Sequence, residues 1–129
     1  MNLVAMVFAI FAALLHVFIF YMESISWTSE KTRSTFGMSE EAAENTKEMA
    51  FNQGFYNLFL AIELFAGVGL YLAGAQGVGL ALMLFGAGSM LAAALLLFIT
   101  SPDKRSAAIK QGTLPLIAVI ALIATMALY

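Results

Sequence analysis

The sequence SEEAAENTKEMAFNQGFYNLFLAIELFAGVGLYL, residues 39–72, begins with acidic and amide side chains and ends in apolar sequence that still contains one acid, Glu63. Its polar residues recur at spacings of three, four and seven, so a helix of about 3.6 residues per turn keeps them on one side. Ionisable groups are costly in hydrocarbon and usually face a bundle interior or a wet cavity. We therefore expect one long helix with an inward-facing polar stripe: Glu41, Asn45, Glu48, Asn52, Tyr56 and Glu63.

The composition indicates a membrane protein. Of 129 residues, 62% are hydrophobic and only 11% are charged, which is far from the balance of a soluble domain. A helix needs about 20 apolar residues to cross a bilayer. The chain offers four such stretches, and we predict an all-α integral membrane protein with a single domain, a bundle of four transmembrane helices at about residues 3–22, 39–73, 78–100 and 112–128.

The second predicted helix is longer than a membrane requires. Ser39 is suited to cap its first turn, where Glu40 and Glu41 favour the positive end of the helix dipole. All six basic residues fall in or beside the connections between helices one and two and between helices three and four. By the positive-inside rule, we expect these connections and the extension of helix two in the cytoplasm, both termini outside, and a multi-pass protein of the inner (plasma) membrane.

Several functions are disfavoured by what the sequence lacks. The absence of cysteine removes thiolate ligands and thiol nucleophiles, and the single histidine gives no cluster for a metal. We expect neither a metal site nor a cofactor. The net charge of −2 offers no basic face for nucleic acid, so membrane lipid and small molecules are the expected partners.

A second polar face is predicted on the first helix. His16, Glu23 and Trp27 share one side if this helix runs a turn past the membrane edge. We expect this face to meet helix two in a cavity open to the cytoplasm, with Glu63 deeper and Gln111 at the rim. His16, Glu23 and Glu63 are the candidate catalytic groups, with Glu23 orienting His16. The candidate ligand-binding residues are Trp27, Arg33, Asn52, Gln53, Tyr56, Asn57 and Gln111.

Each of these features also has a structural interpretation. Intramembrane amides often join helices through hydrogen bonds, and His16 needs only one carbonyl partner. Trp27 is also suited to anchor the chain at the membrane interface, and Arg33 to lie in a solvated loop. Glycines of the third predicted helix, such as Gly79 and Gly86, favour close helix packing, either within the chain or in a homo-oligomer.

Four short motifs resemble those of one known family. They are Tyr21-Met22-Glu23 with Trp27-Thr28, then Thr32-Arg33-Ser34-Thr35-Phe36-Gly37, then Asn52-Gln53-Gly54-Phe55-Tyr56-Asn57, and Gln111-Gly112-Thr113-Leu114-Pro115. In this order they resemble the small integral membrane family catalogued as domain of unknown function 1304. The resemblance implies a four-helix membrane protein and brings no established reaction. Glu63 lies outside these motifs.

Three functions remain open at this level. The first is a cytoplasm-facing pocket that binds a small, partly apolar molecule and acts on it by proton transfer, for example in an isomerisation. The second is a proton-coupled exporter that uses Glu63. The third is a structural or partner-binding role of the acidic segment that starts at Glu40. Whether the protein is an enzyme is left undecided by the sequence.

Overall fold

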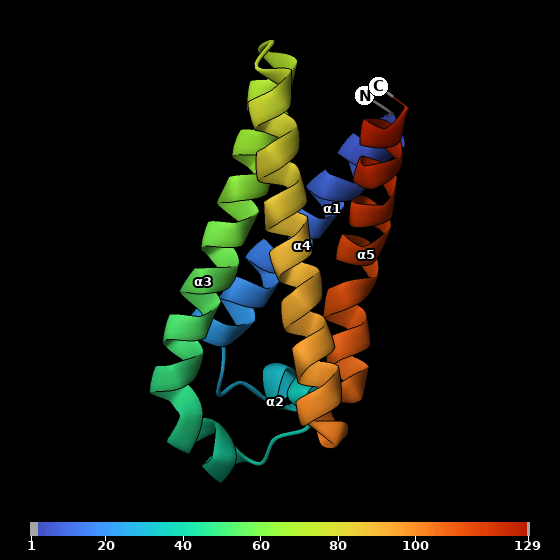
Figure 1. The fold of residues 1–129 in the computed structure, drawn as a ribbon. Coiled ribbons are helices and arrows are strands. Elements are labelled where there is room, and N and C mark those ends of the chain that lie inside the picture. The colour runs from blue at the N-terminus through green and yellow to red at the C-terminus, as the bar shows by residue number, and fades with distance from the viewer. Residues whose placement is uncertain (1–2, 129) are drawn as a thin grey trace.

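The computed structural model describes residues 3–128 and is built of helices. Helix α1 continues without a break into a short π-helix, η1, and α4 is joined to α5 by a 3-10 turn, η2. Figure 1 labels the α-helices. The elements are α1 (Leu3–Phe20), η1 (Tyr21–Ile25), α2 (Glu30–Phe36), α3 (Glu40–Leu72), α4 (Gln76–Thr100), η2 (Pro102–Lys104) and α5 (Arg105–Ala127).

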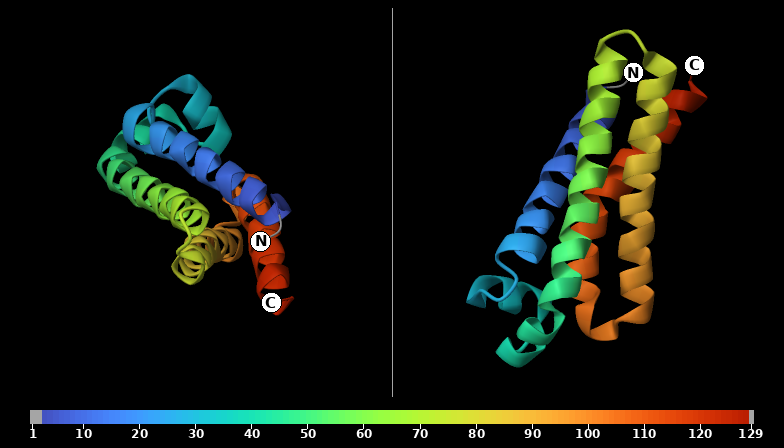
Figure 2. Two further views of the ribbon diagram at one scale, coloured as in Figure 1. Left: turned by 90° about the horizontal axis from the view of Figure 1, so that it is seen from above. Right: turned by 90° about the vertical axis from the view of Figure 1, so that its left-hand side faces the viewer.

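The long helices form one bundle. Helix α1 packs against α3 and α5, and α4 also packs against both, so neighbours around the bundle run α1, α3, α4 and α5 (Figure 2). Four helices in the described part of the chain are long and apolar enough to cross a membrane. The start of α1, the end of α5 and the α3–α4 turn lie at one end of the bundle, and the other two connections lie at the opposite end (Figure 1). The predicted four-helix architecture is therefore confirmed.

Local sequence explains most helix boundaries. The Ser39 hydroxyl accepts the Ala42 N–H at 3.1 Å, which confirms the predicted cap of α3. Gly74 has φ +100° and allows the reversal into α4. Helix α5 begins at Arg105, before the predicted residue 112, because residues 105–111 contain no proline or glycine.

Helix α2 was not predicted from the sequence. Its first turn is capped by Ser29, whose hydroxyl accepts the Thr32 N–H at 3.3 Å. It ends at Gly37, which has φ +66°. The helix spans only seven residues, too few to show a clear apolar period, and it forms because Thr32 and Phe36 are buried against the bundle.

Small residues set the distances between helices. The buried face of α1 includes Ala5, Ala9 and Ala12. A Cβ added to Gly79 on α4 would lie 2.6 Å from the carbonyl oxygen of Gly67 on α3, so these two backbones are in contact. Gly79 thus packs within the chain.

Candidate functional site

Polar residues lie between two apolar core clusters. On α1, His16 comes between Ala13 of one cluster and Ile19 of the other. On α3, the segment Asn52–Asn57 similarly lies between Ala50 and Ala61 of the two clusters, and on α5 residues 111–115 lie between Ala107 and Ala118. Two of the motifs noted in the sequence, residues 52–57 and 111–115, thus lie with His16 between the two clusters.

The centre of this region is a carboxylate and an amide on different helices. The Asn57 Nδ2 of α3 donates a hydrogen bond to the Glu23 Oε1 of η1, and also to the carbonyl of Gln53 at 3.3 Å. Glu23 is 8% exposed, so its side chain is largely removed from solvent. Because a buried carboxyl group needs a partner, this contact fixes the orientation of Glu23.

The π-helix presents Glu23 to α3. In η1, the Ser26 N–H reaches the carbonyl of Tyr21 at 2.9 Å, five residues back. This wider turn buries Met22 and Glu23 together. Single π-turns often occur at functional sites because they change the direction of side chains.

A second contact holds η1 against α3. The Ser24 Oγ donates to the carbonyl of Phe51 at 2.7 Å, and a Cβ added to Gly54 would lie 2.0 Å from this Oγ. Gly54 is therefore required for the close approach that brings Glu23 to Asn57. Gly54 belongs to one of the motifs noted in the sequence, and the structure supplies its physical role.

Trp27 packs beside the site, at the end of the bundle that carries the α1–α3 and α4–α5 connections. Its Nε1 donates to the Thr46 Oγ1 at 3.1 Å, and its ring lies 5.1 Å from the ring of Phe36 on α2. The indole is 9% exposed. Trp27 thus joins α2 and α3 as a packed side chain.

Two cavities meet at Glu23 and Trp27. One, of about 440 Å³, is also lined by Ile25, Phe51 and the charged residues Glu44, Lys47 and Glu48. The other, of about 280 Å³, is also lined by Gln53 and Lys104, among others. Within residues 3–128, Glu23 is the one ionisable residue common to both cavities.

His16 is buried but has a separate partner. It is 2% exposed, and its Nδ1 donates to the carbonyl of Ala12 at 2.9 Å. This leaves Nε2 as the acceptor of the neutral ring. The hydrogen bonds of His16 and Glu23 go to different groups, so the structure does not show the expected orientation of His16 by Glu23.

Except for Glu63, the predicted polar stripe of α3 faces away from the core, contrary to expectation. Asn52 and Tyr56 are exposed, and each lies two residues, or about 200°, around the helix from the buried Ala50 and Gly54. The Asn52 Nδ2 bonds its own helix, at the carbonyl of Glu48, 3.1 Å away. The reason is that small side chains let α1 and η1 approach the opposite face.

Glu63 lies in another interface. It is half-buried, and its carboxyl carbon is 3.7 Å from the position of a Cβ added to Gly86 on α4. Glu63 therefore faces the α3–α4 contact, whereas Glu23 and Asn57 join η1 to α3. The three candidate catalytic groups do not form one hydrogen-bonded cluster.

The structure also places two other predicted ligand-binding residues, Arg33 and Gln111. The Arg33 Nε donates to the carbonyl of Thr28 at 3.2 Å and so ties α2 to the preceding turn. Gln111 is half-buried on α5. Gln53 is exposed and lines the smaller cavity.

Some site residues were missed by the sequence reasoning. Thr46, Glu44 and Lys47 surround Trp27 and the larger cavity. The sequence did contain a signal for the buried face of α3. Ala43 and Ala50 are seven residues apart, as are Gly54 and Ala61, and these small residues mark the face that is buried.

We expect the Trp27→Phe substitution to lower the free energy of unfolding by about 1 kcal/mol, the net value of one hydrogen bond. The phenyl ring would keep the contact with Phe36 and lose the bond to Thr46. Detergent unfolding followed by circular dichroism measures the loss. Thr46→Val removes the same bond, so the double variant should lose little more than either single one, and fully additive losses would contradict this role.

The fold and the site define a class: a four-helix bundle with helices of membrane-spanning length and a buried carboxylate–amide pair between η1 and α3. Residues 10–123 match the family described as "Protein of unknown function (DUF1304)", and the chain belongs to this family. No match was found among curated proteins or among solved structures.

Proposed function

We propose that this protein is a multi-pass protein of the inner membrane that binds a small, partly apolar molecule at the cavities beside Glu23. The observation that carries the proposal is Glu23 itself, a largely buried carboxylate that is held by Asn57 and lines both cavities. Ligand sites are typically concave, mostly apolar and equipped with a few fixed polar groups.

The orientation follows from the basic residues. All six belong to the end of the bundle that carries the α1–α3 and α4–α5 connections, and we place this end in the cytoplasm. The acidic start of α3 and the larger cavity then face the cytoplasm, and the bound molecule enters from that side.

The lining indicates the chemistry of the ligand. The larger cavity combines three carboxylates, Glu23, Glu44 and Glu48, with one basic residue, Lys47. Ile25, Trp27 and Phe51 supply apolar surface. A molecule with an amine or another hydrogen-bond donor on an apolar body matches both features. Glu23 is also the group placed to accept or return a proton if the bound molecule is chemically changed.

Native mass spectrometry of the protein released from its own membranes tests the proposal. We expect a bound mass of small-molecule size on the wild type and its loss from Glu23→Gln, which keeps an oxygen for Asn57 but removes the charge. Glu41→Gln is the matched control, because Glu41 is exposed and outside both cavities. An adduct absent from the wild type, or retained equally by both variants, would contradict the proposal.

The exporter hypothesis has one observation in its favour, the half-buried Glu63 at the α3–α4 contact. The two hypotheses differ in the residue on which function depends, which is Glu63 for the exporter and Glu23 for the pocket. Glu63→Gln would then abolish pH-driven transport in vesicles and leave the bound mass in place, whereas Glu23→Gln would remove the bound mass.

A further inference from the structure

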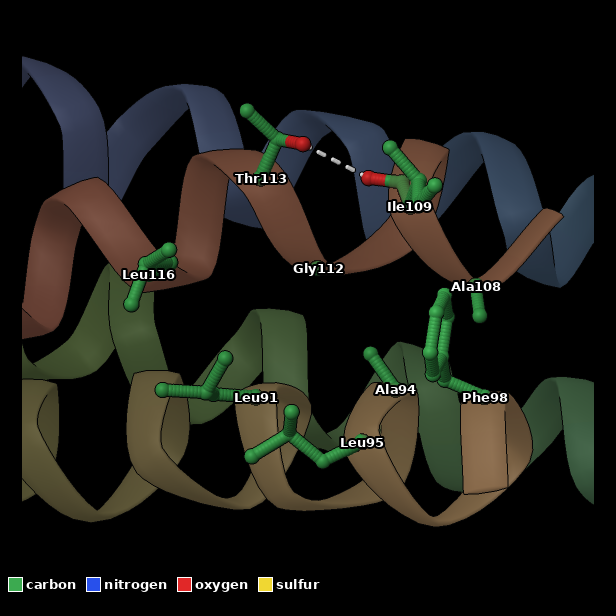
Figure 3. Close-up of a pocket in the computed structure, with 9 residues that line it drawn as sticks. All are labelled: Leu91, Ala94, Leu95, Phe98, Ala108, Ile109, Gly112, Thr113 and Leu116. Carbon is green, nitrogen blue, oxygen red and sulfur yellow. Dashed lines mark hydrogen bonds between the residues drawn. The ribbon is translucent and has the colours of Figure 1, made fainter. Parts of the chain in front are cut away.

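An apolar groove runs between α4 and α5 near their connection. It has a volume of about 260 Å³, and its sides include Leu91, Leu95 and Leu116 (Figure 3). The single hydroxyl in the lining belongs to Thr113 and donates to the carbonyl of Ile109 at 2.7 Å. The groove therefore offers a hydrocarbon surface with no free hydrogen-bonding side chain.

The groove is hollow because its floor is made of small residues. A Cβ added to Gly112 would lie 2.9 Å from the Cβ of Ala94, so the helices touch at this level. Larger side chains, such as the half-exposed Leu95 and Leu116, stand on either side. The groove thus has a floor of small residues between apolar walls, which suits a hydrocarbon chain.

A fixed positive charge lies at the groove. The Arg105 Nε donates to the carbonyl of Phe98 at 3.0 Å, and the guanidinium carbon lies 4.7 Å from the centre of the Phe98 ring, which lines the groove. These two contacts hold the guanidinium in place and leave its terminal amino groups for an anion. Residues 103–110 carry three basic residues against one acid.

We propose that this groove binds one acyl chain of an anionic phospholipid, with the lipid phosphate at Arg105. The hydrocarbon surface matches the acyl chain, and the basic residues match the charge of the head group. The lipid belongs to the leaflet on the basic side of the membrane. This inference uses the orientation proposed above but is independent of the Glu23 pocket.

Lipid titration followed by native mass spectrometry tests this site. The probes are phosphatidylglycerol and phosphatidylcholine with identical acyl chains, added to the delipidated protein. We expect the wild type to retain phosphatidylglycerol at least fivefold better. Arg105→Gln should lower this preference about fivefold, which corresponds to about 1 kcal/mol for one basic residue. Arg105→Lys should keep most of it, which separates loss of charge from loss of fold.

Two controls locate the site. Lys31→Gln removes an exposed positive charge from α2, outside the groove, and should leave the preference unchanged. Thr113→Phe should fill the groove and lower retention of both lipids, whereas Ile123→Phe, at an exposed position elsewhere on α5, should not. Equal retention of the two lipids by the wild type, or equal losses in Arg105→Gln and Lys31→Gln, would overturn the proposal. So would a protein dimer that Thr113→Phe dissociates.

Discussion

Gly79→Ala is expected to lower the free energy of unfolding by about 3 kcal/mol, the upper part of the range for overpacking. The added Cβ would lie 2.6 Å from the Gly67 carbonyl oxygen and 2.6 Å from the Tyr71 backbone nitrogen. Backbone atoms cannot move aside as a flexible side chain can. Helices α3 and α4 must therefore separate along their contact and lose packing on both sides.

The measurement is detergent-induced unfolding followed by circular dichroism. Gly88→Ala is the matched control on the same helix, because a Cβ at Gly88 would meet nothing within 4 Å. That variant should be neutral or gain up to about 1 kcal/mol from helix propensity. Equal stabilities of the two variants would show that the α3–α4 backbone contact is not made in the folded protein.

Asn57→Leu is expected to cost about 1 to 3 kcal/mol and to abolish retention of the proposed ligand. The substitution leaves the buried Glu23 carboxyl without its amide donor. The carboxyl must then turn toward solvent, which changes the wall of both cavities. Trp27 is the chain's single tryptophan and lies beside Glu23 in both cavities, so its fluorescence follows unfolding of this region.

Asn52→Leu provides the same chemical change five residues earlier on the same helix. Asn52 is exposed and bonds only the backbone of its own helix in the structure, so we expect a change within about 0.5 kcal/mol and normal ligand retention. Glu23→Leu combined with Asn57→Leu should cost less than the sum of the two single changes. Equal effects of Asn52→Leu and Asn57→Leu would contradict the assignment of Asn57 as the positioning residue of Glu23.

Sequence reasoning located the helices better than it located the site. Ser39 capped α3 as predicted, and the four apolar stretches became the four long helices. The predicted direction of the α3 stripe was wrong for all its members except Glu63, because polarity alone does not distinguish a wet cavity from the outer surface of the chain. The buried face was marked instead by small residues, Ala50 and Gly54 among them.

The sequence by itself determined the class of fold, because the length and apolarity of each stretch depend on residues near one another in the chain. It also determined which end carries the basic residues. Only the tertiary structure decided that Glu23 pairs with Asn57 while Glu63 faces α4. These choices depend on how closely two helices approach, and that distance is set by residues far apart in sequence: Ser24 against Gly54, and Gly67 against Gly79.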